Sequence, residues 1–215
     1  TEKPAMTMPI PEGMTAATVV DKYMEAIGGK DKVMAVKTIM TVSNATIQGT
    51  PLLMTNKAAA PNKSLMTIAV MGNVMQKIIF DGEKGYQEAR GQKKDMTGEE
   101  IAKAKSENAL FSDINYASGK LLRIEPIDGK NTVVLESGDK EIFYDMTSGL
   151  KVKEVQTVKT PDGKEVKVPT TFADYKAVNG IMIPHWVGLK SGPMTLDFKV
   201  KEIKINEGVS DEDFK

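Results

Sequence analysis

Side chains that commonly carry out chemistry are scarce in this chain of 215 residues. It has one histidine, His185, and no cysteine. A zinc peptidase needs paired histidines, as in H-x-x-E-H, and a serine hydrolase needs a histidine base and a serine on a turn such as G-x-S-x-G. Neither pattern is present, and without cysteine there is no thiol nucleophile or cysteine-ligated zinc. We therefore expect no enzyme activity, no catalytic residue, no metal site and no cofactor.

Two groups of acidic residues have structural explanations instead of catalytic ones. Glu99 and Glu100 are adjacent, so on a helix their side chains diverge by about 100°, and at a helix start they stabilise its dipole. The acidic run 210–214 suggests calcium but lacks the spacing and central glycine of an EF-hand loop. Lys plus Arg and Asp plus Glu both total 29. This balance argues against a nucleic-acid partner.

The proline-rich residues 1–13 are expected to be a linker or tail before one domain, 14–215.

Helices are expected at two places. Thr15 then suits the N-cap of a helix that ends at Gly28-Gly29, with a further turn over 30–36. Thr97 and Glu100 have the spacing of a capping box, which predicts a helix through Ala109 and a second turn over 111–117. Ile101, Ala104 and Leu110 are expected on its buried side.

Elsewhere the apolar residues recur with a period of two. Four strand-like runs lie within 37–82 and seven within 121–206, separated by turn signals such as Asp128-Gly129 and Asn179-Gly180. Successive strands without helices between them favour an antiparallel meander over βαβ units. We expect a mainly β (α+β) fold with about eleven antiparallel strands.

Several turn-and-strand motifs resemble LolA/LolB-like outer-membrane lipoprotein-sorting proteins. They include the helix ending AIGG, the GTPLLM turn, IIFDGEKGY and, in the second half, FYDMTSGLKVKEV and FADYKAVNGIMIP. The individual matching positions are Asp145, Ser148-Gly149-Leu150, Tyr175, Asn179-Gly180, Ile183-Pro184, Ile203, Asn206 and Asp213-Phe214. Similar domains also follow pitrilysin-type (insulinase-type) zinc peptidase domains in some envelope proteins.

The LolA/LolB resemblance implies an unclosed half-barrel of about eleven antiparallel strands, with helices plugging its concave side. It also implies periplasmic binding of a lipid or lipoprotein acyl chain in an apolar cavity, in the cell envelope of a Gram-negative bacterium. The carrier proteins hold their lid closed with an arginine. Arg90 and Arg123 lie outside the matching motifs, so that role is not carried over to them.

An acyl-chain cavity needs an adaptable apolar wall, and this chain has 14 methionines. Each of these methionines has the alternative of filling an ordinary core. Trp186 is expected either at the cavity mouth or in the core, and His185 as an ordinary structural histidine. Periodicity leaves open which strand face is concave. The candidate ligand-binding residues are Met40, Val42, Met54, Met66, Ile68, Val70, Ile78, Phe80, Phe143, Phe172, Trp186, Leu196 and Phe198.

Two other functions stay open at this point. The chain is alternatively an accessory or interaction domain of a pitrilysin-type zinc-peptidase assembly, without the catalytic motif itself, whose partner is a peptidase domain or another envelope protein. A third hypothesis is a scaffold domain that pairs with partners through its edge strands.

Overall fold

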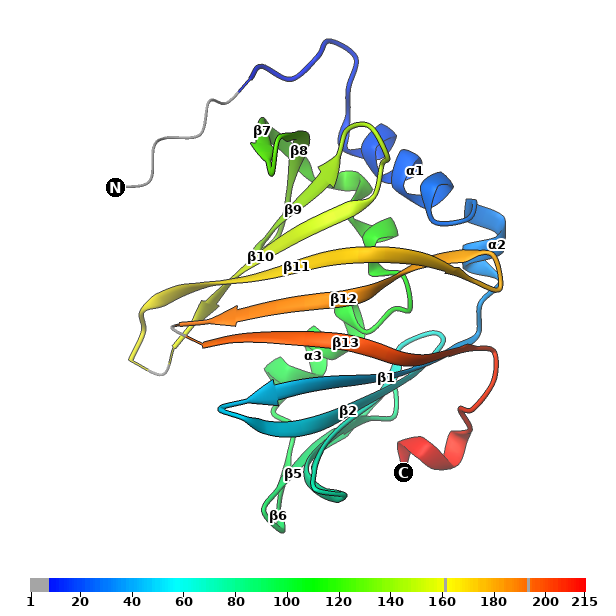
Figure 1. Cartoon of the computed structure of the whole chain (residues 1–215), viewed down its shortest axis with the longest axis vertical. Helices are drawn as coiled ribbons and strands as arrows, with labels where there is room; N and C mark the ends of the chain where they lie inside the picture. Colours follow the sequence, from blue (N-terminus) through cyan, green and yellow to red (C-terminus); the bar gives the residue numbers. More distant parts are fainter. Residues whose placement is uncertain (1–7, 161, 193) are drawn as a thin grey trace. The chain divides into compact units, whose positions relative to one another are not determined.

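The computed structural model describes residues 8–160, 162–192 and 194–215. Within these residues there are thirteen strands in one antiparallel sheet, and consecutive strands run back and forth (Figure 1). Six strands precede the third helix: β1 (Thr38–Ile47), β2 (Thr50–Ala59), β3 (Lys63–Val70), β4 (Asn73–Phe80), β5 (Gly85–Ala89) and β6 (Gln92–Asp95). Seven follow it: β7 (Lys120–Ile127), β8 (Lys130–Ser137), β9 (Lys140–Asp145), β10 (Lys151–Lys159), β11 (Glu165–Val178), β12 (Ile181–Ser191) and β13 (Met194–Ile205).

The sheet is open, because its two edge strands, β6 and β7, are not paired with each other. The order of hydrogen-bonded neighbours is β6-β5-β4-β3-β2-β1-β13-β12-β11-β10-β9-β8-β7. The predicted mainly β, antiparallel and unclosed fold is therefore confirmed. The strand count differs from the expected eleven because β5 and β6 form an additional short hairpin around Arg90-Gly91.

The helices begin where the sequence predicts. They are α1 (Ala16–Ala26), α2 (Lys30–Met34) and α3 (Gly98–Glu107), with short 3₁₀ helices η1 (Ser112–Ser118) and η2 (Asp211–Phe214). The Thr15 hydroxyl accepts a hydrogen bond from the Thr18 N–H at 3.2 Å, so the predicted N-cap is confirmed. The Thr97–Glu100 capping box is confirmed as well. Among the described residues, none of the helices has the length and apolar character required to span a membrane.

Contacts divide the chain into two compact units, which we describe separately. Unit 1 comprises the described residues up to Val33, Asp113–Lys176 and Ile181–Thr195. Unit 2 comprises Met34–Ser112, Ala177–Gly180 and Leu196–Lys215. Of the predicted linker 1–13, residues 1–7 lie outside the described residues, and Met8 pairs with Ile124 of β7 in unit 1.

In unit 1, helix α1 packs against one face of β8–β10. Tyr23 of α1 contacts Tyr144 of β9, with their ring centroids 5.3 Å apart. Five side chains of α1 are buried: Ala16, Val19, Val20, Tyr23 and Met24. We call the face of β8–β10 that α1 contacts the helix face of unit 1. It carries Tyr144, Ile142 and Lys151, while Phe143, Lys153 and Thr171 lie on the opposite face, which we call the open face.

In unit 2, strand register separates two faces of β1–β5 and β13. Directly paired residues share a face, so Met54 lies beside Ile68, and Met66 beside Ile78. Met66 and Ile68 are two residues apart on β3, so all four side chains lie on one face, which we call the wall face. The opposite face carries Met40, Lys57, Leu65 and Ile79 and is covered by the C-terminal residues 209–215, so we call it the tail face.

Candidate functional site

The wall face of unit 2 brings together eight of the thirteen predicted ligand-binding residues. Strand pairing places the candidates of β2, β3 and β4 on it, and Ser43 of β1 pairs with both Met54 and Val200. Leu196 and Phe198 share the face of Val200 because they precede it by even numbers of residues. The eight are Met54, Met66, Ile68, Val70, Ile78, Phe80, Leu196 and Phe198.

Most of this apolar surface is not closed over. Phe80 and Phe198 are buried, at 0% and 7% exposure, whereas the other six side chains are only partly buried. The nearby helix α3 contributes no fully buried residue, and its Ile101 and Ala104 stay half-buried. An apolar strand face with this partial cover has room for further apolar contacts.

Helix α3 is tied to unit 2 by polar contacts near its end. The side-chain amide of Asn108 donates to the Ser64 hydroxyl on the wall face at 2.8 Å. The Lys105 ammonium lies 2.6 Å from the Glu83 carboxylate, and both side chains are largely exposed. Exposed ion pairs contribute little to stability because water screens them. The Lys105–Glu83 pair therefore adds little to holding α3 in place.

Two other predicted candidates, Met40 and Val42, lie on the tail face. Met40 pairs with Lys57 and Lys204, and Val42 with Thr55 and Glu202. On this face Phe214 packs with Ala59, Leu65 and Ile79. The C-terminal tail thus covers Met40's side of the sheet, and these two residues do not join the wall.

The acidic run considered for calcium forms ion pairs with the tail face. Asp213 lies 2.6 Å from the Lys57 ammonium, and Asp211 lies 2.7 Å from that of Lys63. Burial alone would raise the pKa of Asp213, but hydrogen bonds from Lys57 and the Ser210 N–H outweigh it and lower the pKa. Among the described residues, His, Asp and Glu side chains form no group of three suited to a metal ion.

The three candidates in unit 1 lie in different surroundings. Phe143 is 2% exposed on the open face, beneath the cations of Arg123 and Lys153. Phe172 has the Lys151 ammonium 5.0 Å from its ring centroid. Trp186 is half-buried on the open face beside Thr171. Phe172 and Trp186 nevertheless line one crevice, described below, whereas Phe143 does not. His185 is half-buried, and its Nδ1 lies 2.9 Å from the Ile183 carbonyl oxygen.

Sequence reasoning missed a buried charged network on the helix face of unit 1. Asp113 of η1 accepts a hydrogen bond from the Tyr144 hydroxyl at 2.7 Å, and its other oxygen lies 2.8 Å from the Lys151 ammonium. The Tyr175 hydroxyl donates to the Lys151 carbonyl at 2.8 Å. The lysines that alternate along β10 are typical of a solvated face, so the sequence carries no signal that Lys151 is buried.

Burial and neighbouring charges shift the pKa values of the groups in this network. Burial alone would lower the pKa of Lys151, but the charges of Asp113 and Glu154 outweigh it and raise the pKa above its usual value. Burial, together with the Asp113 charge, raises the pKa of Tyr23 and Tyr144. Among described residues, every buried side-chain nitrogen or oxygen has a hydrogen-bond partner. The network ties η1 to the sheet through Tyr144 and Lys151.

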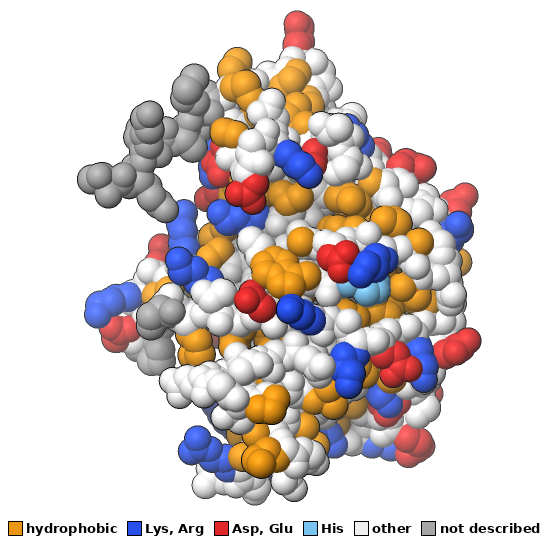
Figure 2. Space-filling model, in the orientation of Figure 1, with side chains coloured by type: hydrophobic (Ala, Val, Ile, Leu, Met, Phe, Trp, Pro, Cys, Tyr) orange, Lys and Arg blue, Asp and Glu red, His pale blue; other side chains and the backbone are white. Residues whose placement is uncertain are grey.

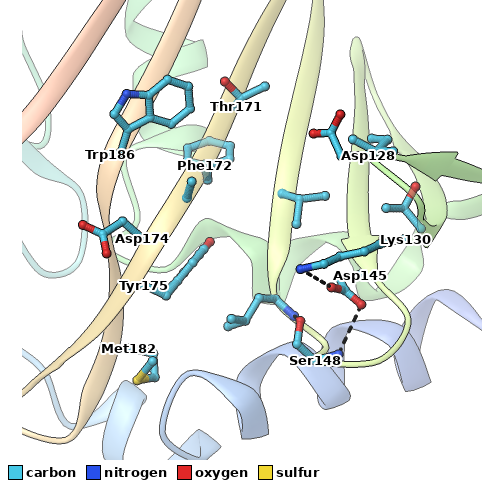
Figure 3. A pocket seen from close by; sticks show the side chains of 15 residues that line it. Asp128, Lys130, Asp145, Ser148, Thr171, Phe172, Asp174, Tyr175, Met182 and Trp186 are labelled. Carbon is cyan, nitrogen blue, oxygen red and sulfur yellow. Dashed lines mark hydrogen bonds and ion pairs between the residues drawn. The ribbon is translucent and has the colours of Figure 1, made fainter.

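A second feature that the sequence did not reveal is a crevice of about 550 Å³ in unit 1 (Figure 3). Its walls come from the turns after β7 and β9 and from β11 and β12. The lining residues include Ile127, Asp128, Lys130, Asp145, Leu150, Val152, Thr171, Phe172, Asp174, Tyr175, Met182 and Trp186, so that two of the predicted ligand-binding residues, Phe172 and Trp186, are among them. Figure 2 shows apolar side chains interspersed with Lys, Asp and Glu side chains over β11 and β12.

Comparisons with known proteins find the same fold in solved structures. A LolA superfamily protein from Nitrosomonas europaea is 13% identical, with a TM-score of 0.60 over 94% of this chain and 98% of its own. A structure described as an outer membrane lipoprotein-sorting protein domain from Vibrio parahaemolyticus is 12% identical, with a TM-score of 0.60 over 93% and 97%. A DUF1329 family protein from Desulfovibrio piger is 11% identical, with a TM-score of 0.58 over 94% and 98%.

Comparisons based on sequence alone find no match. No protein-family model matches the chain, and no curated protein matches it. At 11–13% identity the structural likeness concerns the fold alone. The architecture implied by the turn-and-strand motifs is nevertheless confirmed, and the chain has the open antiparallel fold of LolA superfamily proteins.

Proposed function

We propose that the chain is a non-enzymatic binding protein that holds a lipid or lipoprotein acyl chain on the wall face of unit 2. The observation that carries this proposal is the row of half-exposed apolar side chains on β2–β4 beside a helix with no buried residue. The fold shared with an outer membrane lipoprotein-sorting domain supports the same ligand class.

The wall residues suit a long, flexible, apolar ligand. Removing each CH₂ group of an acyl chain from water contributes about 0.8 kcal/mol, so many weak contacts suffice without a specific polar group. Met54 and Met66 have unbranched thioether side chains that adapt to irregular surfaces. Ile68 and Val70 of β3 and Ile78 of β4 have β-branched side chains, which are stiffer and give the wall a more fixed shape.

Helix α3 is proposed to be the part that yields when ligand enters. Its Lys105–Glu83 ion pair is largely exposed, and none of its described side chains is fully buried. Ligand and helix would then compete for the same wall face. The contribution of the other candidates, Met40, Val42, Phe143, Phe172 and Trp186, is not part of this proposal because they lie elsewhere.

Delipidated protein titrated with a fluorescent fatty acid tests the proposal. Met66→Gln and Ile68→Asn make the wall polar and are expected to weaken binding at least about tenfold together, as roughly 1.4 kcal/mol would. Thr67→Asn is the matched control, because Thr67 lies between them on β3 and points to the tail face. Equal loss in all three variants, or no binding by the unmodified chain, would overturn the proposal.

We extend the proposal to the cell envelope of a Gram-negative bacterium, in the periplasm, where lipoprotein acyl chains need a carrier. Lipoprotein sorting is one use of such binding. A peptidase domain or envelope protein as partner, and the accessory role in a zinc-peptidase assembly, stay predictions. Fractionation of the native cells, followed by immunoblotting, checks the location: recovery with cytoplasmic proteins would contradict it.

A further inference from the structure

The crevice in unit 1 opens where two strands part. The pairing of β10 with β11 reaches Lys153 and Thr171 and extends no further toward the start of β10. A bulge follows in β10 between Lys151 and Lys153, and Asp174 of β11 has a left-handed φ of 53°. Bulges re-aim side chains and end pairing, and they are frequent beside binding sites. Residues of both strands beyond this point line the crevice, Val152 of β10 and Phe172–Tyr175 of β11.

Trp186 lines this crevice beside Gly188. A Cβ atom on Gly188 would lie 2.5 Å from the outer edge of the Trp186 indole and 2.7 Å from the Thr171 hydroxyl. The indole therefore lies down over the backbone of residue 188, and only glycine leaves room for it there. Figure 3 shows Trp186 beside Thr171, with Asp174 and Met182 farther along the same side of the crevice.

The crevice carries more negative than positive charge. Its lining has three carboxylates, those of Asp128, Asp145 and Asp174, and one ammonium group, that of Lys130. Lys130 approaches Asp145 at 4.0 Å, as drawn in Figure 3. Outside the lining, Lys176 pairs with Asp174 at 2.7 Å, but both side chains are more than half exposed. Water screens such a pair, so a ligand cation can replace Lys176.

We infer that the crevice binds an organic cation, a quaternary or protonated ammonium group attached to an apolar body. The indole face attracts cations through its quadrupole, more strongly than the rings of Tyr and Phe. Asp174 supplies the counter-charge, while Leu150, Val152 and Met182 contact the apolar body. The residues named here belong to unit 1, whereas the acyl-chain wall is made of residues of unit 2.

Trp186 is the only tryptophan in the chain, so its fluorescence reports this crevice directly. The probes are benzyltrimethylammonium, neutral benzyl alcohol and anionic phenylacetate, added to the full chain. We expect saturable quenching by the cation with a Kd of about 1 mM or tighter, and at least about tenfold weaker binding of the other two. Equal binding of all three probes, or no saturable binding of the cation, would overturn the inference.

Variants separate this site from nonspecific binding. Asp174→Asn keeps a residue that tolerates the left-handed backbone but removes the charge, and should weaken cation binding several-fold. Asp162→Asn removes an exposed carboxylate of unit 1 that does not line the crevice and should leave binding unchanged. Gly188→Ala displaces the indole and should abolish the quenching, with an unchanged circular dichroism spectrum. If Asp174→Asn and Asp162→Asn behave alike, the assignment is wrong.

Discussion

The two units each set a capped helix beside strands, and they differ in how far that helix buries its side chains. In unit 1, α1 buries five side chains, and the Asp113–Lys151 pair fixes η1 to the sheet. In unit 2, α3 has an equally well-formed capping box and buries none. Capping thus determines where a helix starts, whereas tertiary contacts determine how firmly it is held. We therefore expect the packing of α1 to make unit 1 rigid, and the partial cover by α3 to let a ligand enter and leave the wall face of unit 2.

The largest expected effect comes from breaking the network that closes unit 1. Lys151→Met leaves the buried Asp113 carboxylate without its cation and should lower the free energy of unfolding by about 3–5 kcal/mol. Lys153→Met is the control, because Lys153 lies over the Phe143 ring on the open face and should cost under about 1 kcal/mol. Urea denaturation measures both; similar losses would mean that the network does not hold unit 1 together.

The same network predicts the response to alkaline pH. The pKa of Lys151 is higher in the folded state than its usual value, so the folded protein holds this proton more tightly. Its stabilisation is therefore complete below the ordinary lysine pKa of about 10.4 and is lost as pH rises beyond it. Lys151→Met should show a smaller loss of stability between neutral pH and about 11, the remainder coming from Tyr23 and Tyr144, whose pKa values are also raised by burial. An unchanged pH dependence in this variant would contradict the prediction.

Two adjacent isoleucines of β4 lie on opposite faces of unit 2, so substituting each in turn compares how tightly the two faces are packed. Ile79 is 1% exposed and packs with Phe214, whereas Ile78 is half-exposed on the wall face. Ile79→Ala should lower the free energy of unfolding by about 2–5 kcal/mol, and Ile78→Ala by about 1 kcal/mol. The difference arises because a cavity forms only where neighbouring side chains enclose the removed atoms. Chemical denaturation of both variants provides the measurement. Equal costs would show that the wall face is as tightly packed as the tail face.

A smaller effect is expected at the C-terminal tail. The pKa of Asp213 and that of Asp211 are lowered in the folded state, so their ion pairs stabilise the tail above the ordinary aspartate pKa of about 3.9. This contribution disappears as pH falls through their lowered values. Asp213→Asn should cost about 1 kcal/mol and increase amide exchange over 209–215 at neutral pH. Unchanged exchange would show that Phe214 alone holds the tail.

The smallest effect concerns the turn between β3 and β4. Met71 is 87% exposed and has a left-handed φ of 50°, which a non-glycine side chain adopts at a cost. Met71→Gly should therefore leave stability unchanged or raise it by up to about 1 kcal/mol. Thermal unfolding tests this, with Met75→Gly as the control at a strand position that has no such backbone conformation.

Sequence patterns predicted local structure better than they predicted the site. Thr15, Thr97 and the Asp-Gly turns act through neighbouring backbone groups, so their effects can be read from short segments. The hairpin of β5 and β6 was missed because Gln92–Asp95 is short and fully polar. The face of each wall residue could not be predicted, because a slip of one residue reverses it, and the register shifts at Val42/Ser43 (against β13) and at Ile68/Ala69 (against β4) leave no mark in the sequence. Asp113 and Lys151 meet only through tertiary folding.

The way the chain passes between the units has a consequence for its synthesis. Each unit is assembled from three separate stretches of sequence, and β13 contributes Met194–Thr195 to unit 1 and the rest to unit 2. A ribosome releases these stretches in order, so unit 1 cannot be completed before residue 195 emerges, nor unit 2 before the last residues. Folding that depends on distant partners is slow and leaves strand edges exposed meanwhile. The nascent chain should accordingly depend on holding chaperones until its final strand is made.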